Sequence, residues 1–168
     1  SGTLPHWESV PCEVQWPFGH GLSYTTYEYS DLVVTGGRGE DLIVSIKVKN
    51  TGSVAGSETV MFFTFDIYRS TTPEYKRLRA FGKIHLEVGQ EETVTKTVPA
   101  DDLNFIGPHD DKHYISDPQL SFLVGVGAST DCRTNPDSSL CAEAKPVQDK
   151  QKDDYVGACD TACEVWAH

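Results

Sequence analysis

The nearest approach to a nucleophile motif in this sequence is Gly21-Leu22-Ser23-Tyr24-Thr25. It almost matches the G-x-S-x-G elbow of serine hydrolases, in which a sharp turn between a strand and a helix presents the serine hydroxyl. The stretch lacks the final glycine that allows the strained turn to form. We therefore interpret it as the beginning of a β-strand.

Metal and cofactor motifs are similarly weak. His109-Asp110-Asp111-Lys112-His113 contains metal-binding side chains, but it follows Gly107-Pro108 and no helical pattern aligns the two histidines. A polar loop is the favoured interpretation, and a metal site is the alternative. Gly125-Val126-Gly127 ends an apolar run without the third glycine or the helix of a dinucleotide site. We expect no cofactor.

The cysteines offer a different chemistry. Four of the five lie within residues 132–168, where apolar residues are too sparse to build a core, so we expect disulfides there and an extracellular, secreted or cell-surface location. Their spacing does not fit a zinc finger. Short loops favour two bridges and leave one cysteine unpaired or paired externally, although other pairings stay open. The favoured pairs are Cys132 with Cys141 and Cys159 with Cys163, which leaves Cys12.

Composition restricts the class of protein. The 168 residues correspond to one domain with appendages. With 14 basic and 25 acidic residues the net charge is −11, which opposes nucleic-acid binding. No run approaches the roughly 18 consecutive apolar residues of a membrane span. The N-terminus lacks a starting Met and a signal peptide, so we expect that it arose by cleavage or truncation. Since no Asn-x-Ser/Thr acceptor is present, any attached sugar would be O-linked.

The elements that would position these residues are strands. Residues 1–22 contain three prolines and predict an extended linker from a preceding domain. In residues 42–49, Leu42, Val44, Ile46 and Val48 share one face, as in a half-buried strand. Lys96 shares a face with Val94 and Val98, which suggests an edge strand or a snorkelling lysine. The predicted strands cover residues 24–35, 42–49, 58–68, 78–86, 93–98 and 119–127.

This pattern predicts an all-β fold. Short strands at hairpin spacing, without helical periodicity, are typical of an antiparallel β-sandwich of the immunoglobulin or fibronectin type III kind. We assign residues 23–129 to the sandwich. Residues 130–168 are predicted to form an irregular, polar, disulfide-pinned tail.

Four stretches carry a family resemblance. Pro17-Phe18-Gly19-His20-Gly21-Leu22-Ser23-Tyr24-Thr25 resembles the junction into the C-terminal fibronectin type III-like domain of family 3 glycoside hydrolases, the β-glucosidase and β-xylosidase family. Val48-Lys49-Asn50-Thr51-Gly52 resembles the hairpin of that domain. Leu78-Arg79-Ala80-Phe81-Gly82-Lys83-Ile84-His85-Leu86 and Val124-Gly125-Val126-Gly127-Ala128-Ser129 resemble two of its strands. The resemblance covers residues 17–129.

The resemblance implies where catalysis occurs. In the family, the nucleophilic Asp lies in a Ser-Asp-Trp-like motif on an N-terminal barrel, and the acid/base Glu lies in a following α/β domain. The pairs Ser30-Asp31 and Ser116-Asp117 lack the Trp. We therefore assign no catalytic residue and expect this chain not to be an enzyme by itself.

The resemblance favours a non-catalytic accessory domain that braces the catalytic domains of a secreted parent enzyme. Glycines on both sides of His20 permit a bend and a close approach to another surface. The contact residues that we expect are Trp7, Trp16, Phe18, His20 and Leu22.

Two alternatives stay open. A stand-alone extracellular module would assemble with copies of itself through a sheet edge or the linker. A carbohydrate-binding module would stack aromatic rings on sugars, for example in cell-wall polysaccharides. The aromatic residues considered for this role are Trp7, Trp16, Tyr27, Tyr29, Tyr68 and Tyr75.

Overall fold

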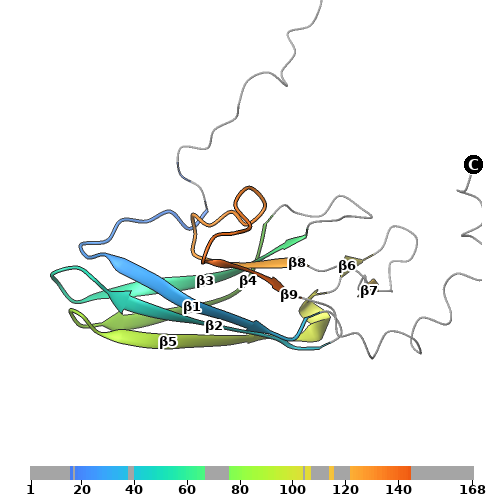
Figure 1. Ribbon diagram of the computed structural model, residues 1–168, viewed down its shortest axis with the longest axis horizontal. Coiled ribbons are helices and arrows are strands. Elements are labelled where there is room, and N and C mark those ends of the chain that lie inside the picture. Colours follow the sequence, from blue (N-terminus) through green and yellow to red (C-terminus); the bar gives the residue numbers. More distant parts are fainter. Residues whose placement is uncertain are drawn as a thin grey trace, which may run out of the picture.

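Two antiparallel β-sheets pack face to face in the computed structural model (Figure 1). It describes residues 16, 18–37, 40–66, 76–103, 105–106, 114–115 and 122–144. The first sheet has the order β1-β2-β5 and the second the order β4-β3-β8-β9. Their strands are β1 (Tyr27–Thr35), β2 (Leu42–Asn50), β3 (Gly56–Asp66), β4 (Arg77–Leu86), β5 (Glu91–Val98), β8 (Phe122–Val126) and β9 (Cys141–Ala144). The predicted all-β sandwich is confirmed.

A small addition lies between β5 and β8. A 3-10 helix (Ala100–Leu103) is followed by β6 (Phe105–Ile106), which pairs with β7 (Tyr114–Ile115). No strand is predicted from the sequence between residues 98 and 119. None of the helices among the described residues has the length and apolar character that crossing a bilayer requires.

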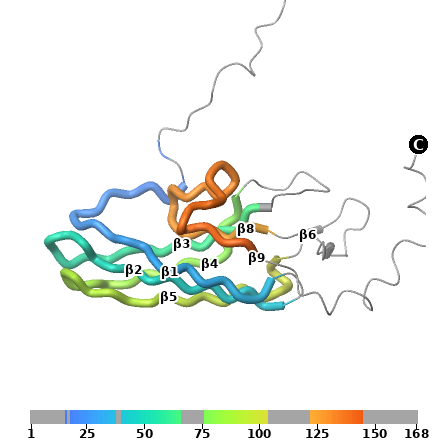
Figure 2. The backbone as a smooth tube through the Cα atoms, viewed as in Figure 1, coloured from blue at the N-terminus to red at the C-terminus, as the bar shows by residue number. Residues whose placement is uncertain are grey.

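The core lies between the sheets, where the alternation of β2 places its apolar residues. Leu42, Val44, Ile46 and Val48 are each at most 1% exposed, as predicted. From the second sheet, alternate residues of β3 and β8 meet them, including Phe62 and Val124. At the two open sides of the sandwich, β4 contacts β5 and β1 contacts β9, so the two sheets meet along both sides (Figure 2).

Lys96 lies on an edge strand, which is one of the two explanations suggested for its position. β5 is the outer strand of the first sheet. The Lys96 side chain reaches across to Gly82 on β4. A methyl group added to Gly82 would lie 2.9 Å from the Cε atom of Lys96. The end of the Lys96 side chain thus covers the β4 backbone at Gly82.

β9 corrects the prediction that all of residues 130–168 form an irregular tail. β9 pairs antiparallel with β8, and Ala144 is 1% exposed. A four-residue strand of Cys, Ala, Glu and Ala has little β propensity of its own, so its pairing depends on tertiary contacts. The second sheet therefore extends to residue 144.

Several predicted features lie outside the described residues. These include most of the linker, the His109–His113 loop and the tail beyond residue 144. The residues concerned among those singled out are Trp7, Cys12, Tyr68, Tyr75, Cys159 and Cys163.

Candidate interdomain contact surface

The lead-in segment, residues 18–26, exposes large apolar side chains one after another. Phe18 is 71% exposed, Leu22 is 95% exposed and Tyr24 is fully exposed. Trp16, just before the segment, is 66% exposed, and His20 is also exposed. The described residues of the predicted contact set therefore all face the solvent, and the structure adds Tyr24 to them. Their role as an interdomain contact stays a prediction.

Gly19 fixes the first end of this segment on the second sheet. Its φ is +84°, a value that favours glycine. A methyl group at this position would lie 2.8 Å from Ala128 Cβ and 2.9 Å from Met61 Sδ. Gly21 has no atom within 4 Å of such a methyl group. The close approach expected for these glycines therefore occurs at Gly19 alone.

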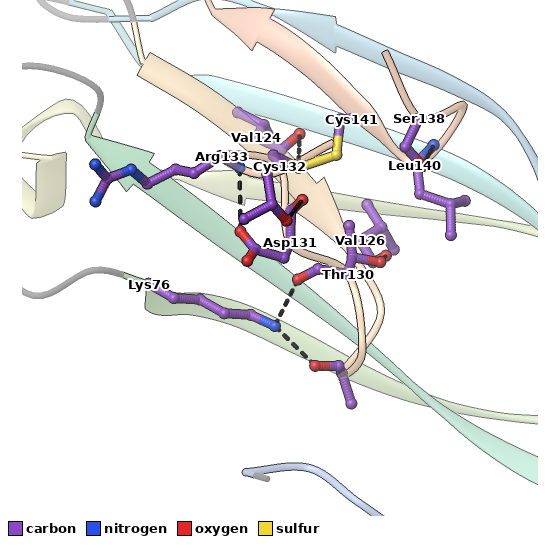
Figure 3. Close-up of a disulfide and its surroundings, with 12 residues drawn as sticks. Lys76, Val124, Val126, Thr130, Asp131, Cys132, Arg133, Ser138, Leu140 and Cys141 are labelled. Atoms are coloured by element: carbon purple, nitrogen blue, oxygen red, sulfur yellow. Dashed lines mark hydrogen bonds between the residues drawn. A yellow bond between two sulfur atoms is a disulfide. The ribbon is translucent and has the colours of Figure 1, made fainter. Parts of the chain in front are cut away.

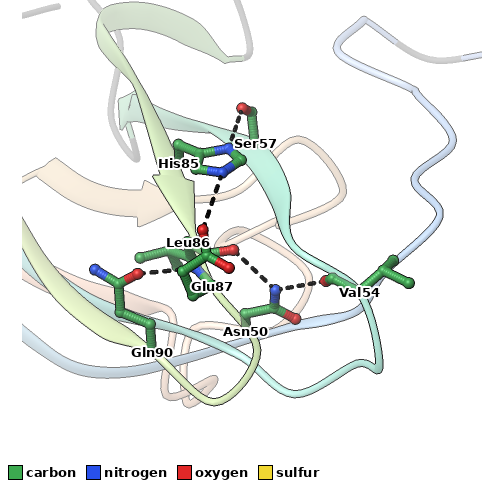
Figure 4. A network of polar contacts seen from close by, with 7 residues as sticks. All are labelled: Asn50, Val54, Ser57, His85, Leu86, Glu87 and Gln90. Carbon is green, nitrogen blue, oxygen red and sulfur yellow. Dashed lines mark hydrogen bonds and ion pairs between the residues drawn. The ribbon is translucent and has the colours of Figure 1, made fainter.

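Thr25 fixes the other end through Asn50. The buried Thr25 hydroxyl donates to Asn50 Oδ1 at 2.7 Å, and the Gly52 amide donates to the same oxygen at 3.0 Å. Asn50 Nδ2 donates to the carbonyls of Val54 at 2.9 Å and Leu86 at 3.1 Å (Figure 4). One fully buried amide thus joins the lead-in segment to the β2–β3 and β4–β5 turns.

An apolar pair continues this surface on the outer face of the second sheet, the face turned away from the first sheet. Met61 on β3 lies directly opposite Phe81 on β4, and Phe81 is 64% exposed. The other outward residues of β4 nearby are Lys83 and His85. Along β4 the aromatic Phe81 is followed at every second position by the polar Lys83 and His85, a pattern from which its exposure could have been predicted.

Further along the same face, the β8–β9 loop covers a second apolar cluster. Phe63, Phe65, Leu123 and Cys132 are all buried there. The predicted Cys132–Cys141 pair is bonded in the structure and joins this loop to β9 (Figure 3). A methyl group on Gly125 would lie 2.5 Å from Cys132 Sγ, so a glycine in β8 makes room for the bridge.

Lys76 holds the same loop from the β4 side. Its Nζ donates to the carbonyls of Ala128 at 2.7 Å and Thr130 at 2.9 Å, and it lies 4.0 Å from the Phe63 ring centroid (Figure 3). Burial lowers the pKa of Lys76, and the charge of Asp131 opposes that shift. The backbone carbonyls and the ring face compensate the ammonium for part of its lost hydration.

A polar group at the far end of the outer face contains the components of a Ser-His-Glu triad. Ser57 Oγ lies 3.1 Å from His85 Nδ1, and His85 Nε2 lies 3.8 Å from Glu87 Oε1 (Figure 4). The second distance is too long for a hydrogen bond, and the His85 and Glu87 side chains are 60% and 72% exposed. This arrangement is an exposed polar cluster, because it lacks the buried, oriented base of a triad.

Two of the aromatic residues proposed for sugar stacking are unavailable. Tyr27 and Tyr29 pack against the main core, and the Tyr29 hydroxyl donates to Glu58 Oε1 at 2.8 Å. Because β1 turns these rings inward, the sequence interpretation of them as exposed was wrong. Within the described ranges, no group of three or more His, Cys, Asp or Glu side chains is arranged to hold a metal ion.

Comparison with known proteins identifies the sandwich. The model of the fibronectin type III-like domain matches residues 58–130. The thermostable β-glucosidase B of Acetivibrio thermocellus is 42% identical over 96 residues, which are 55% of this chain and 13% of that enzyme. A β-glucosidase of Kluyveromyces marxianus is 35% identical over 130 residues, which are 75% of this chain and 15% of that enzyme. The crystal structure of a β-glucosidase from Listeria innocua in complex with glucose matches 85% of this chain and 19% of its own, with 28% identity and a TM-score of 0.67.

The chain carries a fibronectin type III-like domain of the family 3 glycoside hydrolases. This domain is not the catalytic one, and the chain spans only 13% and 15% of the length of the two curated relatives above. The matched region begins in β3 and ends at Thr130. In the structure, the fibronectin type III-like domain also includes β1, β2 and β9, and the lead-in segment is anchored to it at Gly19 and Thr25.

Proposed function

We propose that this fibronectin type III-like domain is a non-catalytic accessory domain of a secreted β-glucosidase-like enzyme, in which it braces the catalytic domains. The lead-in segment, together with Trp16, Met61 and Phe81, is the contact. The relatives that support this are named as β-glucosidases, and they match the chain over a small fraction of their own length.

The exposure of the lead-in segment is the observation that carries the proposal. Phe18 and Leu22 remain 71% and 95% exposed although both ends of the segment are fixed to the sandwich. Burying a side chain of this size contributes about 1.5–3 kcal/mol. A neighbouring domain that covered both would therefore gain about 3–6 kcal/mol, which is comparable to the stability of a whole domain.

The Cys132–Cys141 bridge supports secretion of the parent enzyme. Disulfides persist in oxidising compartments and are rare in the cytosol of most organisms. In this domain the bridge holds the loop that covers the second apolar cluster, and Cys132 is fully buried. Reduction would therefore uncover apolar surface on the face that we assign to the contact.

A chimera tests the bracing role. Residues 16–144 of this chain replace the matched region of the A. thermocellus β-glucosidase B, and two properties are measured: hydrolysis of an aryl β-glucoside and the midpoint of thermal inactivation. In the chimera, the double variant Phe18→Ser, Leu22→Ser should lower the midpoint. Val88→Ser is the matched control, because Val88 is 56% exposed but lies on the β4–β5 turn and is not one of the proposed contact residues.

Two outcomes would contradict the proposal. The first is a double variant that inactivates at the same temperature as the unmodified chimera and as Val88→Ser. The second is hydrolysis of the aryl glucoside by the isolated chain, at a rate that follows its concentration through purification.

A further inference from the structure

The first half of β3 has an unpaired edge. On one side, β4 pairs with β3 from Gly56 onward. On the other side, β8 pairs with β3 only from Phe62 to Asp66 (Figure 1). Over residues 56–60, no described strand continues the second sheet beyond β3.

The backbone groups that face this open side are identified by the alternation of the strand. The Gly127 amide donates to the Met61 carbonyl at 2.9 Å, so the Met61 carbonyl points to the β8 side. In an antiparallel strand, alternate residues point their N–H and C=O groups the same way, so those of Ser57 and Thr59 point to this side too. No described residue hydrogen-bonds to them there. The edge thus presents two donors and two acceptors.

The lead-in segment runs along this edge without pairing with it. Gly19 lies against Met61, and Thr25 lies against Gly56, so the segment is antiparallel to β3. Five strand residues span about 17 Å, and six extended residues reach at most about 20–22 Å. The segment therefore has only a few ångströms of slack and cannot move far from the edge.

The two contacts differ by one residue from a single strand register, because six residues separate Gly19 from Thr25 and five separate Met61 from Gly56. With Thr25 opposite Gly56, His20 comes opposite Met61, so the segment must shift by one residue at that end to form a strand. If Thr25 stays opposite Gly56, Tyr24 comes opposite Ser57 and Leu22 comes opposite Thr59. Each of these pairs would exchange two N–H···O bonds, because Ser57 and Thr59 are the residues whose backbone groups face the open side. Opposed residues share a face, so the Leu22 and Tyr24 side chains would join Met61 and Phe81 on the outer face.

We propose that residues 20–24 add to β3 as a further strand when the catalytic domains dock, and that the outer face so completed is the surface that they contact. The inference rests on the proposed function and specifies how the contact forms. The partner it fits is an apolar surface of the catalytic domains. In the isolated chain, no apolar burial offsets the entropy cost of ordering the segment. Docking buries Leu22 and Tyr24 and so provides the free energy that compensates for this cost.

Amide hydrogen exchange distinguishes the two states. In the isolated chain, the Ser57 and Thr59 amides should exchange about as fast as exposed loop amides, while those of Glu58 and Val60, which face β4, are protected. In the chimera, the amides of Leu22, Tyr24, Ser57 and Thr59 should all exchange at least about tenfold more slowly than in the isolated chain. Equal exchange in both states, whether fast or slow, overturns the proposal.

A proline on the open side provides a matched pair of variants. Thr59→Pro removes an N–H that faces the open side and leaves the β3–β4 bonds in place, whereas Thr59→Ala keeps the N–H. In the chimera, Thr59→Pro should abolish the slowed exchange at Leu22 and Tyr24, and Thr59→Ala should retain it. Circular dichroism of each isolated variant checks that the sandwich is intact.

The two proposals fail separately. If Phe18→Ser, Leu22→Ser lowers the inactivation midpoint of the chimera but the Ser57 and Thr59 amides stay unprotected, the bracing role stands and strand addition is wrong. If Thr59→Pro leaves Leu22 and Tyr24 protected, strand addition is also wrong. If neither the midpoint nor the exchange responds, both proposals fall.

Discussion

Replacing Asn50 should destabilise the domain more than any other single truncation of a polar side chain near the lead-in segment. Asn50 is fully buried, and its amide makes four hydrogen bonds to four different residues. Asn50→Ala removes all four, while the backbone of β2 can keep its ladder. The variant therefore isolates the contribution of the side-chain amide.

The magnitude follows from the partners that are left behind. The bonds to the Thr25 hydroxyl and to the Leu86 carbonyl, at 2.7 and 3.1 Å, are buried, so their loss leaves two buried polar groups each with one hydrogen bond fewer. Each such group costs about 1–3 kcal/mol. Water can replace the amide at the partly buried Gly52 and Val54 groups. We expect a loss of about 3–5 kcal/mol from a total stability of about 5–15 kcal/mol.

Urea unfolding followed by far-ultraviolet circular dichroism measures this loss. The midpoint should fall with little change in the m-value, because the surface exposed on unfolding is nearly the same. Thr51→Ala is the control: the Thr51 side chain is exposed, so its removal should change the stability by about 0.5 kcal/mol or less. A cost below about 1 kcal/mol for Asn50→Ala would refute the assignment of Asn50 as the residue that joins the three loops.

Asn50→Asp adds a pH test of the same site. One Asp oxygen would face the Val54 and Leu86 carbonyls, so burial and these dipoles should raise the pKa of the new carboxyl above its unfolded value of about 3.9. A raised folded pKa gives stability that is present below the unfolded pKa and is lost as the pH rises. The loss of stability of Asn50→Asp relative to the wild type should therefore be largest at neutral pH and become smaller toward pH 4. A pH-independent difference would contradict the geometry.

Three further predictions concern the rest of the sandwich. The double variant Cys132→Ser, Cys141→Ser should lower the free energy of unfolding by about 2–3 kcal/mol, the value expected for a disulfide that closes a loop of this length. Equal urea midpoints for the variant and the wild type would contradict this. Gly125→Ala should lower the free energy of unfolding by about 1–3 kcal/mol and slow formation of the Cys132–Cys141 disulfide, because the new methyl group would lie 2.5 Å from Cys132 Sγ. Urea unfolding measures the first effect and free-thiol titration the second. A disulfide that forms as fast as in the wild type would argue against this crowding. Burial and the hydrogen bond to Glu58 raise the pKa of Tyr29, so stability should fall as the pH rises above about 10, the unfolded value. Tyr29→Phe should flatten that alkaline loss in unfolding experiments, and an equally steep loss would count against the pKa shift.

Sequence reasoning succeeded where periodicity and turn chemistry act locally. The alternation of β2 identified its buried face, because a period of two is set by the backbone itself. The unusual position of Lys96 indicated an edge strand for the same reason. Short loop length favoured the Cys132–Cys141 bridge, which the structure contains.

Reasoning from the sequence failed where a residue's environment is made by distant parts of the chain. Nothing local to Cys141–Ala144 predicts a strand, and β9 forms because β8 offers an edge and the disulfide holds the chain beside it. Tyr27 and Tyr29 have strand-forming neighbours, but only the position of β1 over the second sheet turns their rings inward. Asn50 reads as a turn residue, and its four hydrogen bonds come from segments up to 36 positions away.

Strand alternation and short motifs are local properties, so they were sufficient to predict an antiparallel sandwich and to indicate the enzyme family that the domain resembles. Tertiary structure alone decided which surface is free to make a contact. The exposure of Phe81 depends on the pairing of β3 with β4, and the open edge at Ser57 and Thr59 depends on where β8 ends. Both features depend on how strands that are distant in sequence pair with each other, so neither could be predicted from local sequence patterns.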